Sequence, residues 1–538
     1  MTDVLIVGAG PSGLTLANVL AEYGVGCRIV DKKSGPVERS RAALVHVRTL
    51  ELWAKLGMAE RAVERGLKTT RVEIYERGRR ASEFPLAGRG TESLTPFPYA
   101  LTLPQGETER LLVEGLEERG ARVEWNAEIL GLEDARGGGR AVVRREGSDE
   151  VTIEARWVVG ADGASSPVRN SLGLGFGGET YEQTGLLADV EMDTELDPGT
   201  LRLNLTRGGF VGIGALPGGL YRLFGAVPPS FAARDLSGRV SHEAYGEVGL
   251  EDLQKWFNEY FFVDARLARA EWASLFRIHS RISERFRVGN VFLVGDAAHI
   301  HSPAGGQGMN LGIGDAYNLG WKLALVAKGQ AYPKLLDSYE AERYRIAKTV
   351  LRYSDRGFSL EATKNPVAEW ARANVATRLV GPLTRLGTVR GLIFRLFSQT
   401  WIGYRKSPAV AGTFAKRKGP RPGDRAPYGV FEWEQGGMGS VFDLLRGMGH
   451  HMLLFEGLEP NPALGAYRQA IEDVLGRYEV DASVHVVPTK ERKVHQLYGA
   501  IEPRMFLVRP DGHISYAGSL GDLGGLVAHL DGLFCEGL

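Results

Sequence analysis

Three glycines at fixed spacing follow the first apolar run of the chain. Gly8, Gly10 and Gly13 come directly after a β-branched segment and open a stretch whose apolar residues have helical spacing. At such a strand–helix turn the backbone can approach a pyrophosphate, and the N–H groups at the helix start can meet its charge. Asp31 ends the next predicted strand, where it can accept hydrogen bonds from an adenosine ribose. The pattern favours a dinucleotide site over an ordinary β–α turn, but it does not distinguish FAD from NAD.

Two later apolar runs end in an acid beside a glycine. Asp162-Gly163 closes one run and Gly295-Asp296 closes the other, and the second is followed by the glycine-rich residues 305–310 and a long helical segment. A glycine-rich helix start can stabilise negative charge on a ligand that it faces. The alternative is a glycine-rich loop that only packs under the helix.

These three motifs, in this order, closely resemble those of the class A flavoprotein aromatic hydroxylases, and the resemblance covers the whole chain. Residues 422–427, Pro-Gly-Asp-Arg-Ala-Pro, resemble the interdomain signature of the phenol hydroxylase and polyketide hydroxylase branch. The resemblance implies an FAD-dependent monooxygenase that uses NADPH or NADH and O2. It would hydroxylate a phenolic or polycyclic aromatic substrate through a flavin C4a-hydroperoxide. We expect NAD(P)H to bind transiently, because the chain has no second strand–GxGxxG–helix unit.

The resemblance also implies the residues of the site. The residues expected to bind the cofactor are Gly8, Gly10, Pro11, Ser12, Gly13, Asp31, Lys32, Arg41, Gln105, Asp162, Gly163, Asp296, Gly305, Gly306, Gly308, Met309 and Asn310. Pro303 is a catalytic candidate close to the flavin, and no catalytic base is identified. Arg48 and Arg169 are expected either to meet flavin or nicotinamide phosphates or to be solvated helix residues.

The elements around the motifs predict an α/β fold with an inserted antiparallel sheet and a compact C-terminal unit. The resemblance implies that these parts are a Rossmann-like FAD-binding domain, a substrate domain and a thioredoxin-like domain. The FAD-binding domain is expected to be discontinuous and to comprise residues 1–70, 101–178 and 281–400. The substrate domain is expected to comprise residues 71–100 and 179–280. The thioredoxin-like domain is expected to comprise residues 415–538. Residues 46–64 are expected to form one amphipathic helix.

An aromatic substrate pocket is expected on the inserted sheet. Phe210, Tyr221 and Phe224 lie on two predicted strands that form a hairpin turning at residues 217–219. Aromatic side chains at alternating strand positions can line a pocket, but core packing is the more frequent outcome.

Composition excludes several other classes of protein. The 65 Lys and Arg balance the 65 Asp and Glu, so bulk charge does not favour a nucleic-acid partner. Cys27 and Cys535 form no CxxC, which argues against a disulfide framework, a zinc cluster and thiol redox activity. His299 and His301 lack further ligands, so no metal site is expected. We expect a soluble, cytoplasmic protein without a membrane span, which could form a homodimer.

Two other functions remain to be weighed. A flavin-dependent halogenase would be expected to carry a WxWxIP motif, which this chain lacks. A flavin-containing binding protein that sequesters an aromatic compound without turnover is the alternative from a different class, and the motifs alone do not exclude it.

Overall fold

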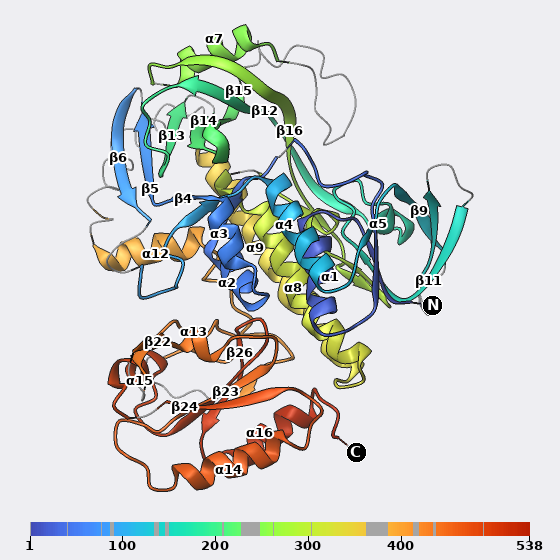
Figure 1. The fold of residues 1–538 in the computed structure, drawn as a ribbon, viewed down its shortest axis with the longest axis vertical. Coiled ribbons are helices and arrows are strands. Elements are labelled where there is room, and N and C mark those ends of the chain that lie inside the picture. Colours follow the sequence, from blue (N-terminus) through green and yellow to red (C-terminus); the bar gives the residue numbers. More distant parts are fainter. Residues whose placement is uncertain are drawn as a thin grey trace.

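The computed structural model describes residues 2–39, 41–76, 78–86, 91–133, 139–145, 150–206, 209–227, 248–261, 263–302, 304–361, 383, 386–412, 419–433, 437–487 and 489–537. Within them the chain forms three large sheets, of eight, eight and five strands. Figure 1 shows the first two sheets flanking the central helices, with the third sheet below them in residues 411–537, which we call the C-terminal unit. The α/β fold class predicted from the sequence is confirmed. The domain ranges and the thioredoxin-like assignment stay predictions.

The first sheet has a parallel centre. Its path runs β17-β18-β11-β1-β2-β8, and β9 and β10 extend β11 as an antiparallel ribbon. The strands are β1 (Thr2–Val7), β2 (Cys27–Val30), β8 (Val123–Glu124), β9 (Ala127–Glu133), β10 (Gly139–Arg145), β11 (Glu150–Gly160), β17 (Arg287–Val288) and β18 (Val291–Leu293). Because β1, β11 and β18 are parallel neighbours, their carboxyl ends share one edge of the sheet. Each of the three sequence motifs begins at one of these ends.

Helices cover this sheet, and α1 and α8 are largely buried. The helices that carry site residues are α1 (Pro11–Glu22), α4 (Gln105–Glu118), α5 (Pro167–Ser171), α8 (Gly308–Ala327) and α9 (Asp337–Glu361). Helix α1 packs on both α8 and α4, and Figure 1 shows α1 and α8 side by side. The buried side of α1 includes Leu14, Ala17 and Leu20, which sit on the helical spacing expected from the sequence. The first core therefore fixes the starts of α1 and α8 relative to the sheet edge.

The second sheet lies over the helices and has two different faces. Its order is β19-β16-β12-β15-β14-β13-β5-β6, and all neighbours are antiparallel except β13 and β5. The strands are β5 (Arg71–Glu76), β6 (Arg79–Pro85), β12 (Phe176–Asp193), β13 (Thr200–Thr206), β14 (Gly209–Ala215), β15 (Tyr221–Val227), β16 (Arg266–Ser283) and β19 (His299–Ile300). One face packs on α7 (Leu250–Tyr260). The other face contacts α12 (Gly387–Phe397) through Ile393.

The predicted single helix over residues 46–64 was wrong. The structure has two helices, α2 (Val47–Lys55) and α3 (Ala59–Arg65). They are separated at Gly57, whose φ of +70° lies in the left-handed region that other residues disfavour. The amphipathic spacing continued across the break, so it concealed the helix end that the glycine produces.

The C-terminal unit is built on a mixed sheet of order β20-β26-β25-β23-β24. Its elements are β20 (Ala411–Gly412), β21 (Val430–Glu432), β22 (Met438–Ser440), α13 (Val441–Leu444), β23 (His450–Phe455), α14 (Leu464–Leu475), β24 (Ala482–Val487), α15 (Arg492–Tyr498), β25 (Arg504–Val508), β26 (Ile514–Ser519) and α16 (Leu523–Asp531). Strands β25 and β26 form a hairpin that turns at Gly512. A short three-stranded sheet near α2 completes the description, formed by β3 (Leu44–Val45), β4 (Leu67–Thr69) and β7 (Ala100–Thr102).

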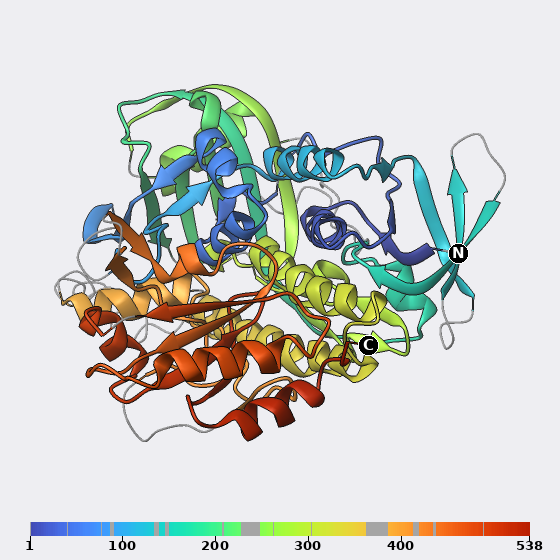
Figure 2. The same ribbon diagram turned by 60° about the horizontal axis from the view of Figure 1, so that its bottom comes forward.

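Buried charges join the C-terminal unit to the central helices, in front of which it lies in Figure 2. Arg509 donates to both carboxylate oxygens of Glu342 on α9, at 2.7 and 3.0 Å, and Lys322 on α8 donates to the same carboxylate at 2.8 Å. These side chains are at most 1% exposed. Burial alone would raise the pKa of Glu342, but Arg509 and Lys322 lower it to about 2. The docking therefore depends on a carboxylate that cannot be left unpaired.

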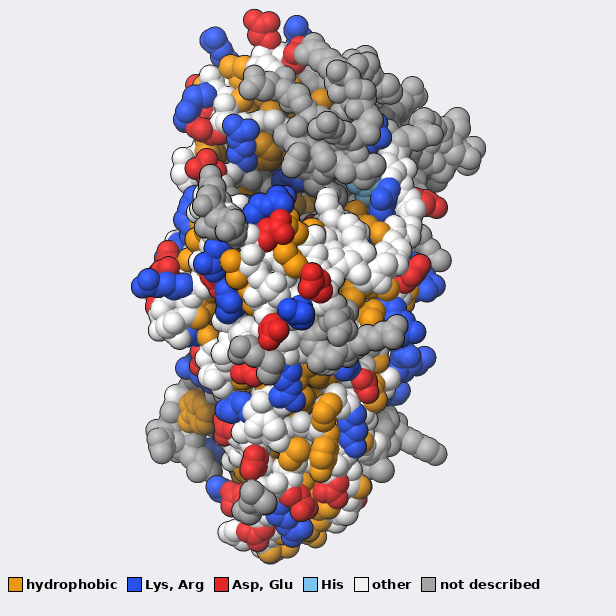
Figure 3. All heavy atoms as spheres, turned by 90° about the vertical axis from the view of Figure 1, so that its right-hand side faces the viewer, with side chains coloured by type: hydrophobic (Ala, Val, Ile, Leu, Met, Phe, Trp, Pro, Cys, Tyr) orange, Lys and Arg blue, Asp and Glu red, His pale blue; other side chains and the backbone are white. Residues whose placement is uncertain are grey.

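None of the helices in the described part of the chain combines the length and the apolar composition that a membrane span requires. Figure 3 shows basic and acidic side chains mixed over one face of the molecule, in keeping with the zero formal net charge.

Replacing Arg509 tests the docking cluster. Arg509→Met should lower the free energy of unfolding by about 3 kcal/mol, because it leaves the Glu342 carboxylate buried with less positive charge around it. Urea unfolding measures the change. The control is Arg468→Met, which removes an ion pair to Glu472 whose arginine is 51% exposed and should cost less than about 1 kcal/mol. Equal losses in the two variants would contradict the role given to the cluster.

Candidate functional site

The three predicted turns meet at the carboxyl edge of the first sheet. The Ala161 amide donates to the Val7 carbonyl at 2.7 Å, and the Val294 amide donates to the Gly160 carbonyl at 2.9 Å. The turn after β11 therefore lies between the turns after β1 and β18. A Cβ atom on Gly8 would stand 2.3 Å from the Ala161 oxygen, so only glycine permits this approach.

The first turn is shaped as a cradle. A Cβ on Gly13 would lie 1.9 Å from the Gly8 oxygen, whereas a Cβ on Gly10 would meet no atom within 4 Å. The glycines at both ends are thus required for packing, and the middle one faces open space. Helix α1 starts here with Pro11 as its first residue, and no described side chain caps its first N–H groups. Such a helix start offers donors to an anion.

Asp31 stands at the end of β2 beside this cradle. Its Oδ2 accepts from the Ala9 amide at 2.6 Å and its Oδ1 accepts from the Lys33 amide at 2.8 Å. The carboxylate is 9% exposed, while the Lys32 side chain is exposed to solvent. Asp31 therefore orients the turn through Ala9 and leaves its further lone pairs toward the cradle.

The second turn contains an incompletely satisfied carboxyl group. Asp162 accepts from the Val168 amide at 3.0 Å through Oδ2, and its buried Oδ1 has no hydrogen-bond partner among the described residues. Burial raises the pKa of this carboxyl group to about 6. An orphaned acceptor in a groove is the kind of atom that a ligand hydroxyl satisfies. Gly163 follows with a φ of +82° and opens the turn.

Arg169 ties the second turn to the third. Its guanidinium donates to the Ala164 carbonyl at 2.7 Å and to the Ala297 carbonyl at 2.9 Å, and the side chain is 4% exposed in total. It is therefore neither a solvated helix residue nor directed outward at a phosphate. Arg48 is also buried and donates to the Asp511 carbonyl in the C-terminal unit.

The third turn lies against the start of α1. A Cβ on Gly295 would stand 2.5 Å from the Ser12 hydroxyl oxygen. The Asp296 side chain is open to solvent in the groove, yet the surrounding protein removes enough water to raise its pKa, and His299 and Arg41 partly offset the rise. Arg41 is thus close enough to Asp296 to influence its charge, as expected if both residues line one groove.

A buried carboxylate on α8 holds the third turn in place. Asp315 on α8 accepts from the Gly295 amide at 3.1 Å, from His299 Nε2 at 2.7 Å and from Arg343 Nε at 2.6 Å. Burial alone would raise the pKa of Asp315, but Arg343 and His299 lower it. Sequence reasoning missed this residue, because a polar residue inside a helical run is also typical of a solvated face.

The glycine-rich stretch forms a tight turn at the start of α8. Gly305 and Gly306 have φ values of +78° and +61°, and the N-cap residue Gln307 makes no side-chain capping bond to the helix that begins at Gly308. The Asn310 side chain is occupied with the protein itself, since its amide nitrogen donates to the Leu44 and Gly306 carbonyls at 2.8 and 3.0 Å. Any contact from Asn310 to a cofactor would therefore come from its backbone.

Two further expected positions flank these glycines in the sequence. Met309 is only partly buried and packs on the first core. Pro303, the catalytic candidate, lies outside the described residues.

Gln105 is held by a glutamate that sequence reasoning did not single out. Glu109, fully buried on α4, accepts from Gln105 Nε2 at 2.9 Å, from the Val37 amide at 2.8 Å and from Lys33 Nζ at 3.2 Å. It connects the start of α4 to the loop after Asp31. A contact that spans 72 residues has no local sequence signal, so only the fold reveals it.

The structure separates the three aromatic residues proposed for the pocket. Phe210 and Phe224 lie on the face of the second sheet that is turned away from α7, with ring centroids 6.0 Å apart. Tyr221 is three residues from Phe224, so it points to the opposite face and packs on the α7 core. Tyr221 is therefore not part of the same wall.

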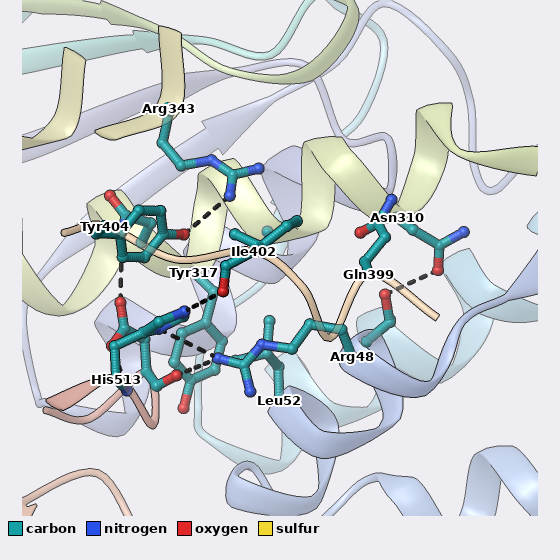
Figure 4. Close-up of a pocket in the computed structure, with 13 residues that line it drawn as sticks. Arg48, Leu52, Asn310, Tyr317, Arg343, Gln399, Ile402, Tyr404 and His513 are labelled. Carbon is teal, nitrogen blue, oxygen red and sulfur yellow. Dashed lines mark hydrogen bonds and ion pairs between the residues drawn. The ribbon is translucent and has the colours of Figure 1, made fainter. Parts of the chain in front are cut away.

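One small cavity in the described structure lies away from the three turns. It is found where α2 and α8 meet the C-terminal hairpin, and Figure 4 shows Arg48, Tyr317, Tyr404 and His513 around it. Its volume of about 10 Å³ leaves room for roughly one water molecule and none for an aromatic ring. We therefore assign it to the junction and not to a substrate. The described residues also contain no group of three His, Cys, Asp or Glu that could hold a metal ion.

Comparisons with known proteins agree with this geometry. The family described as "FAD binding domain" matches residues 1–354. The chain is 37% identical over 358 residues to pentachlorophenol 4-monooxygenase from Sphingobium chlorophenolicum, an alignment that covers 65% of this chain and 63% of that protein, less than two thirds of its length. It is 37% identical over 425 residues to 6-methylpretetramide 4-monooxygenase from Streptomyces rimosus, covering 78% and 73%.

Similarity to a solved structure extends over nearly the whole chain. The anhydrotetracycline hydroxylase OxyS from Streptomyces rimosus superposes with a TM-score of 0.73 at 28% identity, covering 99% of each chain. The similarity therefore includes the C-terminal unit as well as the first two sheets.

Asp296 offers the first test of the groove. Asp296→Ala should lower the FAD content of the purified protein several-fold, because it removes a carboxylate that faces the shared groove of the three turns. Absorbance of released flavin per chain measures the content. The control is Glu118→Ala at an exposed ion pair with Arg61, which should keep the wild-type FAD content. Undiminished FAD in the Asp296 variant would contradict the assignment.

Asp162 should give the apoprotein a measurable pH dependence. Its pKa is raised from 3.8 to about 6, so the folded state binds this proton more tightly than the unfolded state. The contribution of Asp162 to stability therefore falls as the pH rises from about 4 to about 6. The side chain of the Asp162→Asn variant does not titrate, so the variant does not lose stability in this way. Its free energy of unfolding relative to wild type should therefore increase by up to about 3 kcal/mol between about pH 4 and about pH 6.

Melting temperatures of the two apoproteins at several pH values test this expectation. Asp473→Asn changes an exposed aspartate on α14 and serves as the control. A stability difference between the Asp162 variant and wild type that stays constant from pH 4 to 7 would show that Asp162 does not titrate in this range.

Proposed function

This chain belongs to the class A FAD-dependent aromatic hydroxylases, and on that premise we propose that it is a monooxygenase that uses FAD, NAD(P)H and O2 to hydroxylate an aromatic compound. One observation carries the proposal. The three turns after β1, β11 and β18 meet at one edge of the first sheet, and α8 lies against the third of them, since a Cβ on Gly312 would stand 3.0 Å from the Gly295 Cα atom.

The proposal assigns a part of FAD to each of the three turns. We propose that Gly8, Gly10 and Gly13 cradle the pyrophosphate and that Asp31 binds the adenosine ribose. The open space over Gly10 and the uncapped start of α1 support the first assignment. Asp296 in the groove would bind the ribityl chain, and the orphaned Asp162 oxygen would accept from a cofactor hydroxyl.

Bound FAD would supply the redox chemistry, namely hydride uptake from NAD(P)H and activation of O2. The chain's own contribution is electrostatic and steric. The start of α8 presents positive partial charge to the groove, and the glycine turn before it lets backbone stand close to the ring system.

We further propose that the second sheet supplies the substrate site. Phe210, Phe224 and Leu203 lie on the face turned away from α7, and such an apolar wall suits a planar aromatic compound. The names of the relatives support phenols and polycyclic polyketides as the substrate classes. The first sheet with its helices would then be the FAD-binding domain and the second sheet the substrate domain, within the ranges expected from the sequence.

Three further expectations belong to the same proposal. NAD(P)H should act as a transient co-substrate and not as a resident cofactor. The cytoplasmic location and the homodimer stay predictions. The alternative of a binding protein that sequesters an aromatic compound is less favoured, because all of the flavin motifs are intact and the relatives named above are monooxygenases or hydroxylases.

Turnover tests the proposal directly. The FAD-loaded protein is mixed with NADH or NADPH in air, and pentachlorophenol, simpler phenols and anhydrotetracycline are added one at a time. We expect at least one compound to accelerate NAD(P)H oxidation about tenfold or more and to yield a product with one added oxygen atom by mass spectrometry. The FAD-depleted protein is the matched control and should give neither signal.

The sequestration alternative predicts a different outcome. A compound would bind tightly, measured by quenching of flavin fluorescence, but no compound in the panel would accelerate flavin reduction or gain oxygen. That result would contradict the proposed enzyme.

A further inference from the structure

A buried histidine holds the backbone of the glycine turn. His46 stands just before α2, is 2% exposed and places Nε2 3.1 Å from both the Gly305 and the Gly306 carbonyl oxygens. Both oxygens can only accept a hydrogen bond, so Nε2 must carry the hydrogen. One imidazole N–H is therefore shared between two successive carbonyl groups of the turn.

The backbone of His46 is tied to the same turn by a second route. Its amide donates to Asn310 Oδ1 at 2.7 Å, and Asn310 Nδ2 donates to the Gly306 carbonyl at 3.0 Å. The Thr49 hydroxyl also donates to Asn310 Oδ1, at 2.8 Å. The start of α2, the glycine turn and the first turn of α8 thus form one closed hydrogen-bonded group.

The turn depends on donors from outside because it has few constraints of its own. Gly305 and Gly306 lack side chains and have positive φ values, so many other conformations are open to them. The imidazole supplies a donor without adding a full charge. Burial lowers the pKa of His46 to about 4, and the two carbonyl hydrogen bonds only partly oppose this shift, so the ring is neutral at pH 7.

We propose that His46 is a positioning residue that sets how strongly the start of α8 stabilises negative charge on the bound flavin. The inference rests on the proposed function, because it requires FAD in the groove. A helix start acts on a charge only over its first turn, so its effect depends on where the preceding residues hold it. The carbonyl oxygens of Gly305 and Gly306 carry negative partial charge, so they must also stay directed at a hydrogen-bond donor.

Loss of this donor should change the cofactor and not only the fold. Without the imidazole, two buried carbonyl groups lose a hydrogen bond and the glycine turn is free to rearrange. The start of α8 would then favour the negative charge of reduced flavin less strongly. Reduction of FAD should become harder, which lowers its midpoint potential.

The experiment compares three variants of the full-length, FAD-loaded protein. His46→Leu removes the donor and keeps much of the volume, whereas His46→Gln retains an amide N–H at comparable reach. Thr49→Val removes one donor to Asn310 and is a milder change in case the leucine variant does not fold. The midpoint potential is measured by equilibrium reduction against a reference dye, and FAD affinity by fluorescence titration.

We expect His46→Leu to shift the reduction equilibrium about tenfold toward oxidised flavin, which is about 30 mV for a two-electron couple. His46→Gln should recover most of this shift, and Thr49→Val should move the potential in the same direction by a smaller amount. The control is Lys55→Gln at the other end of α2, where Lys55 donates to the Leu445 and Gly447 carbonyls and not to the turn. Its potential should match wild type.

Three results would overturn the inference while leaving the proposed function intact. These are an unchanged potential in both the leucine and valine variants with FAD bound, an equal loss in the leucine and glutamine variants, and an equal shift in the Lys55 control. A wild-type protein that binds no FAD would instead refute the proposed function, and this inference with it.

Discussion

The geometry of the site depends on one constraint, the close approach of three backbone turns at one edge of a parallel sheet. Neighbouring parallel strands end on the same side, so β1, β11 and β18 place their turns next to one another. The approach is closer than any side chain would allow at Gly8 and Gly13. The place where the three turns meet is thus made largely of backbone.

Buried polar side chains then hold these turns in place. Arg169 joins the second and third turns, Asp315 supports the third from α8, and Glu109 orders the loop beyond Asp31. His46 and Asn310 do the same for the glycine turn. Each of these groups bonds to backbone atoms, so the site is positioned by residues that need not touch the ligand.

The motifs could be predicted from the sequence more completely than the buried side chains that hold them in place. Gly8, Gly13 and Asp31 carry a local pattern, because strand, turn and helix follow one another within a few residues. Glu109 and His46 have no such pattern, since their partners lie 72 and about 260 residues away. Periodicity also concealed the helix end at Gly57. The placement of Tyr221 and Phe224 on opposite faces, by contrast, follows from their odd spacing along one strand and could have been predicted.

The C-terminal unit contributes to the same construction. It contacts α2 through Arg48 and through Glu51, whose carboxylate accepts from Arg425 Nε at 2.8 Å, and it contacts α9 through Glu342. Helix α2 therefore lies between this unit and the glycine turn. A unit without a CxxC motif can still serve the site by fixing the helices on which the site is built.

The central claim is that the three turns form one FAD site, and titration of the apoprotein with FAD tests it most directly. The account predicts saturable binding of one FAD per chain, whereas a colourless protein that binds no FAD would contradict it.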